Sequence, residues 1–253
     1  MTFGMVSGAF FAVCLGALVL ATQCGLWLRK HFAQAVEREG QSLKTLESTI
    51  LALLGLLLGF TFSMAVARFD TRKTLEIDEA NDIGTLWLRT SLLSDDARNA
   101  ERGFIRQYVA ARLEFGAARR DTTRMAKSAN DTAGLQAKMW DIAVKEANQR
   151  RDTTTGLFVS GLNDCIDVTE KRAAAFENTI PWAAWMMMLA IGAIGCALVA
   201  IGLQANVFSL RLLLPLVLAC TLAMIYDIDS PRSGLIRVHQ QSMERLQQQV
   251  MAK

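Results

Sequence analysis

The stretch LLGLLLGFTFSMAVARFDTRK, residues 53–73, joins an apolar segment to a charged one without a proline or a turn signal between them. Residues 49–67 carry no charge, whereas residues 68–93 mix charged and apolar side chains. About 20 apolar residues in helical form cross a bilayer core of roughly 30 Å, because a helix satisfies its backbone hydrogen bonds within the segment. The stretch therefore predicts a membrane helix that continues unbroken into water.

Composition places this helix in an integral membrane protein. Mean hydropathy is +0.25 and 52% of the residues are hydrophobic, yet 20% are charged, and the charges are segregated into blocks. The leader MTFGMVSG has no Lys or Arg, so we expect the first apolar stretch to be a retained helix and not a cleaved signal peptide. Four stretches have the length and composition of a membrane span: residues 8–28, 49–67, 181–203 and 207–226.

These spans divide the chain into four parts. Residues 1–67 hold the first two spans, 68–179 a polar insert, 180–226 the last two spans and 227–253 a C-terminal segment. An even number of spans puts both termini and the insert on one side of the membrane. More Lys and Arg residues lie near the membrane on that side, which predicts that it is cytoplasmic.

The insert is expected to be a helical bundle. It contains no proline, and its apolar residues recur at spacings of three and four. Breaks are predicted at Ser94, near Gly116 and near Thr153, and Ser94 is followed by two acids, as at a helix N-cap. Past the last span, an apolar stripe predicts an amphipathic helix that packs on the insert or on a neighbouring subunit. Its residues are Leu235, Val238, Ser242, Leu246 and Val250.

The sequence offers little for catalysis. The only histidines, His31 and His239, are far apart, and there is no HExxH, GxSxG, P-loop or GxGxxG motif. Four of the five cysteines lie in apolar spans, and Cys165 lies in the insert without a CxxC partner. We therefore expect no enzyme activity, no cofactor, no metal site and no nucleic-acid partner.

Residues 72–89 of the long helix carry four acids, Glu76, Asp78, Glu79 and Asp82. Carboxylates three residues apart can approach one cation. A helix rarely wraps enough ligands around calcium, however, so a solvated face is the favoured interpretation.

The second span carries a candidate pore face. Around an oligomer axis it would line a narrow apolar throat, which can gate by dewetting, and the edge of a phenylalanine ring can favour an anion. The same pattern is typical of side chains that face lipid or pack within a bundle. Beside this face, Gly55 and Gly59 form a GxxxG motif that permits close helix approach. The face consists of Ala52, Leu56, Phe60, Ser63 and Ala67.

Charged residues also follow the fourth span, at Asp227, Asp229 and Arg232. Pro231 ends the span, Arg232 can meet an aspartate or a headgroup, and Gly234 permits a turn. A structural role is therefore favoured over a sensor site.

Several short motifs carry a family resemblance. They are GFTFS (59–63), RFDTRK (68–73), EANDIGT (79–85), LND.ID (162–167) before IP (180–181), and D.DSPRSGL (227–235). This pattern resembles the bestrophin-like membrane protein family of unknown function, which is distantly similar to bestrophin channels. The resemblance implies an all-α protein of a bacterial inner membrane, with a helical cytoplasmic bundle inserted between the second and third of four membrane helices.

The resemblance also implies a function. Bestrophins are pentameric channels, mostly anion-selective, and their three apolar neck positions, matched through LGF (58–60), fall on Ala52, Leu56 and Phe60. It thus implies a homo-oligomeric channel, with chloride as the first candidate ion and a pore mouth at Arg68, Asp70 and Arg72. The acidic run of the bestrophin calcium clasp is absent, so calcium activation is not expected. The alternative is a membrane signalling or scaffold protein whose insert binds a partner.

Overall fold

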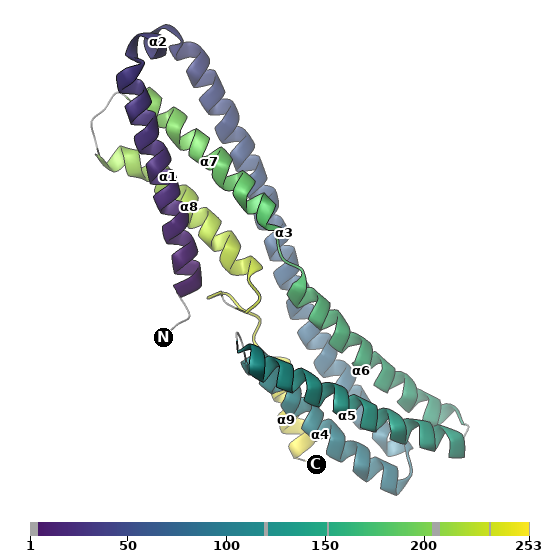
Figure 1. The fold of residues 1–253 in the computed structure, drawn as a ribbon. Coiled ribbons are helices and arrows are strands. Elements are labelled where there is room, and N and C mark those ends of the chain that lie inside the picture. The colour runs from purple at the N-terminus through teal and green to yellow at the C-terminus, as the bar shows by residue number, and fades with distance from the viewer. Residues whose placement is uncertain (1–4, 119–120, 151, 204–207, 233, 253) are drawn as a thin grey trace. The chain divides into compact units, whose positions relative to one another are not determined.

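A computed structural model describes residues 5–118, 121–150, 152–203, 208–232 and 234–252, and these residues contain helices and no strand (Figure 1). The all-α prediction is confirmed. The elements are α1 (Met5–His31), α2 (Ala33–Arg38), α3 (Gly40–Arg89), the 3-10 turn η1 (Thr90–Leu92), α4 (Asp95–Ala117), α5 (Thr122–Gln149), α6 (Thr153–Glu177), α7 (Trp182–Gly202), α8 (Phe208–Asp229) and α9 (Gln241–Met251).

Helix α3 is 50 residues long and includes both the apolar run and the charged run, as predicted. It begins at Gly40, nine residues before the expected start of the span at Thr49, because nothing between them breaks a helix. Four helical stretches contain a segment that is long and apolar enough to cross a membrane: Ser7–His31, Gly40–Leu92, Thr153–Gly202 and Arg211–Asp229. The expected turn at residues 204–206 and the expected start of the last span at Val207 lie outside the described residues.

The chain divides into two compact units. The membrane unit comprises Met1–Arg68 and Thr179–Arg237, and the polar unit comprises Phe69–Asn178 and Val238–Lys253. Helix α3 contributes residues 40–68 to the first and 69–89 to the second.

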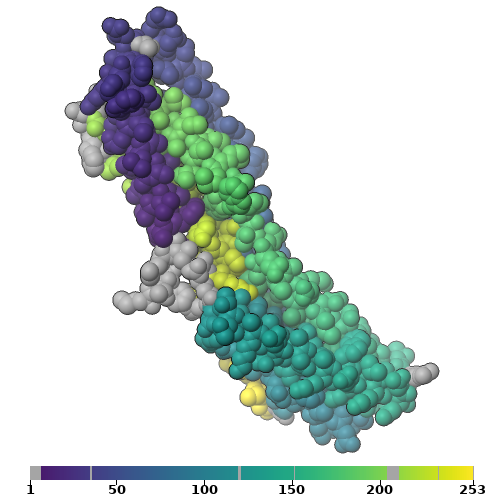
Figure 2. All heavy atoms as spheres, viewed as in Figure 1, coloured from purple at the N-terminus to yellow at the C-terminus, as the bar shows by residue number. Residues whose placement is uncertain are grey.

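In the membrane unit, α1 packs along α7 and α8, and Figure 2 shows the side chains of α1 and α7 in contact. Glycines allow this approach: a Cβ atom on Gly25 would lie 2.3 Å from the backbone oxygen of Ala197. Gly192 of α7 lies where three other helices of this unit meet it. The nearest side chains are those of Leu18, Leu54 and Leu218.

In the polar unit, helices α4, α5 and α6 begin at capped residues. The Ser94 hydroxyl accepts a hydrogen bond from the Ala97 amide, which confirms the predicted N-cap, and Asp121 and Asp152 cap α5 and α6 in the same way. The core that these helices enclose includes Ile83, Leu86, Ile105, Tyr108, Val109, Met139, Ala143, Phe158, Leu162 and Cys165.

The C-terminal helix is shorter than predicted. It begins at Gln241, and Leu235 is 68% exposed, so the upstream half of the expected stripe is wrong. The chain before α9 is held out of helical geometry because the amides of Leu235 and Ile236 donate to the Asp227 carboxylate. Within α9 the buried face consists of Met243, Leu246 and Val250.

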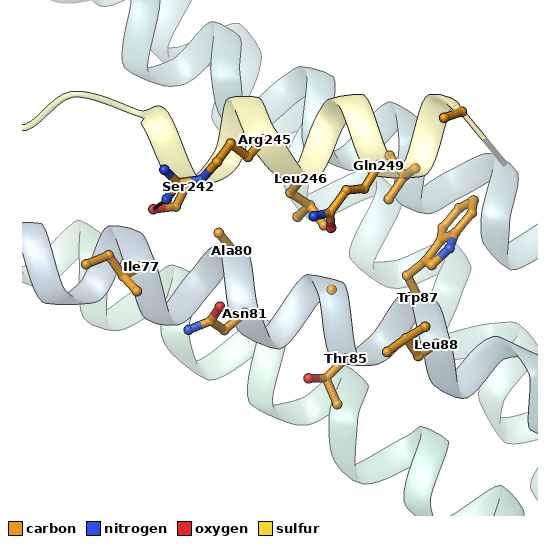
Figure 3. Close-up of a pocket in the computed structure, with 13 residues that line it drawn as sticks. Ile77, Ala80, Asn81, Thr85, Trp87, Leu88, Ser242, Arg245, Leu246 and Gln249 are labelled. Atoms are coloured by element: carbon orange, nitrogen blue, oxygen red, sulfur yellow. Dashed lines mark hydrogen bonds between the residues drawn. The ribbon is translucent and has the colours of Figure 1, made fainter.

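Helix α9 packs on the polar half of α3 and borders a groove with it. Figure 3 shows Leu246 and Gln249 reaching from α9 towards α3. A Cβ atom on Gly84 would lie 3.4 Å from the Leu246 side chain, so a small residue on α3 admits the leucine. At the far end of α9, the Arg106 guanidinium donates to the Val250 carbonyl at 2.9 Å.

One carboxyl group in the bundle is buried without a partner. Glu101 of α4 is fully buried, and neither of its side-chain oxygens has a hydrogen-bond partner among the described residues. Burial raises the pKa of this carboxyl to about 8, from an ordinary value of 4.5. At neutral pH the folded protein therefore holds Glu101 as the neutral acid.

Because of this burial, we expect the contribution of Glu101 to the free energy of unfolding to become less favourable as pH rises. The unfolded chain loses the proton above about pH 4.5, whereas the folded chain keeps it until about pH 8, so the unfolded state binds fewer protons in that window. We expect the Tm of Glu101→Gln to exceed that of the parent by a margin that widens from pH 5 to pH 8. Glu114→Gln, at a half-exposed site on the same helix, is the control. A margin that does not change with pH would contradict the prediction.

Candidate functional site

The candidate pore face lies on the surface of the single chain. We name the α3 stripe as the set Ala52, Leu56, Phe60, Ser63 and Ala67, and all five are exposed. Leu56 is 55% exposed and Phe60 is 65% exposed, although both are large and apolar. The opposite side of the same helix packs inside the membrane unit. Its buried residues are Leu54, Leu58 and Ala65.

The two glycines beside the stripe, Gly55 and Gly59, have free space next to their Cα atoms. Cβ atoms built on Gly55 and Gly59 would meet nothing within 4 Å, so no other described part of the chain packs closely there. The close approaches inside the membrane unit use other glycines: a Cβ on Gly195 would lie 3.0 Å from the Leu51 side chain, and Gly25 abuts α7. Gly25 follows Ala21 by four residues, so α1 also carries a small-residue pair at this spacing.

The three charged residues that follow the stripe differ in exposure. Arg68 is half-buried and donates to the Asp229 carboxylate at 3.2 Å. Asp70 is exposed, whereas Arg72 is only 3% exposed. Asp70 is therefore the member of this set whose charge lies openly on the surface of the chain.

Two buried aspartates fix the end of the membrane unit. Asp227 accepts hydrogen bonds from the Ser7 hydroxyl at 2.6 Å and from the amides of Leu235 and Ile236, each at 2.8 Å. Asp229 accepts from the Ile180 amide at 2.8 Å as well as from Arg68. The aspartates thus tie the end of α8 to the start of α1, to α3, to the segment before α7 and to the chain beyond Pro231.

This bonding supports the structural role that the sequence favoured for Asp227 and Asp229, while Arg232 is half-buried nearby in sequence. Carboxylate oxygens that already accept several hydrogen bonds have little capacity left for a cation. Among the described residues, no cluster of three or more His, Cys, Asp or Glu side chains could hold a metal ion.

Gly234 makes the Asp227 turn possible. A Cβ atom there would lie 2.4 Å from the Asp227 backbone oxygen, a contact too short for any side chain. We expect Gly234→Ala to lower the Tm of the purified protein by several degrees, since the turn must open and its buried hydrogen bonds must lengthen. Gly16→Ala in α1, where a Cβ would meet nothing within 4 Å, is the matched control and should not lower the Tm. Equal Tm values for the two variants would contradict this account.

The polar unit contains a buried acid network that the sequence analysis missed. Glu79 is fully buried and bonds to the guanidinium groups of Arg112 and Arg172, which are each 3% exposed. The Thr169 hydroxyl lies 2.6 Å from the Tyr108 hydroxyl and 3.5 Å from Glu79, and Gln136 donates to both hydroxyls. Burial lowers the pKa of Arg172 to about 10, so it is still charged at neutral pH.

Glu76 is also buried, and its carboxylate accepts the amides of Ser242 at 3.0 Å and Met243 at 3.1 Å. These are orphan amides in the first turn of α9, so an acid on α3 caps a helix that lies 166 residues further along the chain. The predicted solvated face is thus wrong for Glu76 and Glu79, although Asp78 is exposed. The two acids are three residues apart and lie in line with Arg72 and Ile83, which are also buried, so this spacing marks the buried face of the polar half of α3.

Removing the Glu79 charge should destabilise the polar unit strongly. Glu79→Gln leaves two buried guanidinium groups facing a neutral amide, and breaking a buried ion pair costs about 3–5 kcal/mol. With about 2–4 °C of Tm per kcal/mol, we expect the Tm to fall by roughly 10 °C. Asp78→Asn, at the exposed neighbouring position, should leave the Tm within about 2 °C. A Tm for Glu79→Gln that matches this control would refute the importance of the network.

Comparisons with known proteins agree with this geometry at the level of the family and the fold. The model of the Bestrophin-like domain matches residues 16–243. No curated protein matches the chain.

Solved structures of similar fold include two variants of a bacterial bestrophin homologue from Klebsiella pneumoniae. Each is 15% identical to this chain. The first has a TM-score of 0.67, and the match covers 96% of this chain and 98% of that one. The second has a TM-score of 0.68, and the match covers 95% of this chain and 97% of that one. A variant of a protein described as a membrane protein has a TM-score of 0.70 at 14% identity, with 95% and 97% covered. From the family match over most of its length and its four apolar helices, this multi-pass membrane protein belongs to the Bestrophin-like family.

Proposed function

We propose that this chain is one subunit of a homo-oligomeric ion channel whose pore is lined by the α3 stripe. The observation that carries the proposal is that Leu56 and Phe60 are more than half exposed on a helix whose opposite side is packed. Large apolar side chains on a membrane helix must face lipid, another copy of the chain or a pore. In a ring of copies with α3 towards the axis, the stripe would form a continuous apolar lining.

The constriction is proposed at Leu56 and Phe60, because Ala52 is too small to narrow a ring at its own level. A ring of these side chains resists wetting, so ions pass only when the throat widens or their hydration is replaced. Phenylalanine ring edges carry a partial positive charge. Chloride is therefore the first candidate ion.

The pore mouth is proposed at the turns of α3 that follow the stripe, which carry Arg68, Asp70 and Arg72. Asp70 is exposed, whereas Arg68 is bound to Asp229 and Arg72 is buried. The local charge that an approaching ion meets would then depend chiefly on Asp70. Neutralising it should move the reversal potential towards that of chloride.

Assembly and orientation complete the proposal. The open surface at Gly55 and Gly59 leaves room for a helix of a neighbouring copy, and the bestrophin resemblance suggests five copies. The bestrophin resemblance suggests a bacterial inner membrane, and the Lys and Arg balance favours the orientation in which the termini and residues 68–179 are cytoplasmic. Conduction of this kind requires neither a catalytic group nor a cofactor.

Single-channel recording in planar bilayers under a KCl gradient tests the proposal. We expect the parent to conduct with a reversal potential near that of chloride, and Phe60→Ala to raise conductance several-fold because the throat widens. Phe62→Ala is the matched control, since Phe62 lies two residues on, about 200° around the helix, and is 37% exposed; its conductance should stay within about twofold of the parent.

Three outcomes would revise the proposal. Equal conductance of the Phe60 variant and the parent would remove the α3 stripe from the pore. A reversal potential near that of potassium would assign a cation. No current from the parent at any voltage or pH would favour the signalling or scaffold alternative.

A further inference from the structure

The membrane unit contains a cleft of about 840 Å³ at the connection between its first two long helices. It is bordered by the end of α1, by α2, by the start of α3, by the end of α7 and by Arg211 of α8. Its apolar lining includes Leu26, Val36, Leu198 and Ile201. No residue of the α3 stripe lines the cleft, and neither Asp227 nor Asp229 does, so the cleft is separate from the proposed pore.

The charged lining of the cleft is mainly basic. Four cationic side chains, Arg29, Lys30, Lys44 and Arg211, stand against two acids, Glu37 and Glu47, so the lining has an excess of two positive charges. In the part of the chain that the structure describes, Arg29, Lys30 and Lys44 take part in no ion pair. Their charges are therefore available to an anionic group.

The position of the cleft selects the kind of anion. Arg29 and Lys30 are in the last turn of α1, and the uncharged run of α3 begins just after Glu47. Trp27, near the end of α1, and Phe32, just after it, are each 55% exposed, as aromatic residues are at a membrane–water boundary. A ligand at this level can place an anionic head among the cations and an apolar chain along the leucine and isoleucine lining.

We propose that this cleft binds the phosphate of a phospholipid headgroup, with Arg29 and Lys44 as its main ligands. Arginine and lysine side chains both bind phosphate oxygens through charge-assisted hydrogen bonds. A soluble phosphate ester would use the same cations but leave the apolar lining unused. The diacyl chains therefore contribute to binding, and the headgroup alone binds weakly.

The test is native mass spectrometry of the full-length protein in an uncharged detergent, titrated with phosphatidylglycerol. We expect a bound lipid whose Kd rises at least tenfold in the double variant Arg29→Gln and Lys44→Gln. Arg38→Gln, at an 85% exposed site in the same connection that does not line the cleft, should leave the Kd unchanged. The charge-preserving pair Arg29→Lys and Lys44→Arg should restore binding, which separates loss of charge from misfolding.

Two further ligands identify the source of the phosphate. Diacylglycerol, which lacks the phosphate, should bind at least tenfold more weakly, and glycerol phosphate, which lacks the chains, should bind weakly as well. Equal binding of glycerol phosphate would overturn the lipid assignment in favour of a soluble phosphate ester. Equal binding of diacylglycerol, or an unchanged Kd in the double glutamine variant, would overturn the phosphate site.

Discussion

Helix α3 runs through an apolar segment and a polar segment with one uninterrupted set of backbone hydrogen bonds. The rest of the structure depends on this constraint. In the bilayer core no water is present to hydrogen-bond a backbone N–H or C=O group that loses its helical partner, so a turn or kink there is costly. Side chains alone must then distinguish its two halves. The membrane half has an exposed apolar stripe opposite a packed face, and the polar half has buried acids opposite an exposed face.

Buried carboxylates do the same physical task in both units. Asp227, Asp229 and Glu76 each accept backbone amides that no helix or strand would otherwise satisfy. An amide left without an acceptor in a buried place costs about 1–3 kcal/mol. These acids therefore specify how non-neighbouring segments meet, and Glu79 adds the same specificity through two arginines.

The sequence predicts the features that depend on local pattern. Length and hydropathy located the spans, and Ser94 with its following acids located a helix start, because each signal lies within a few residues. The burial of Glu79 could not be predicted in this way, since Arg112 and Arg172 lie 33 and 93 residues away. The same limit explains the error before α9: Leu235 fits a helical stripe, but its amide is bonded to an aspartate eight residues earlier. At the candidate site, the stripe residues were identifiable by spacing, whereas their exposure depends on how α3 packs within the membrane unit.

The way α9 completes the polar unit has a consequence for biosynthesis. Residues 69–178 leave the ribosome long before Gln241–Met251, and two further membrane spans are made in between. Until α9 arrives, the Glu76 carboxylate lacks the amides that it accepts, and the apolar surface that will receive Met243, Leu246 and Val250 has no cover. The bundle must therefore wait in an incomplete state throughout insertion of the last spans. Its final folding step therefore follows synthesis of the last two spans, and a chain truncated before residue 241 never reaches it.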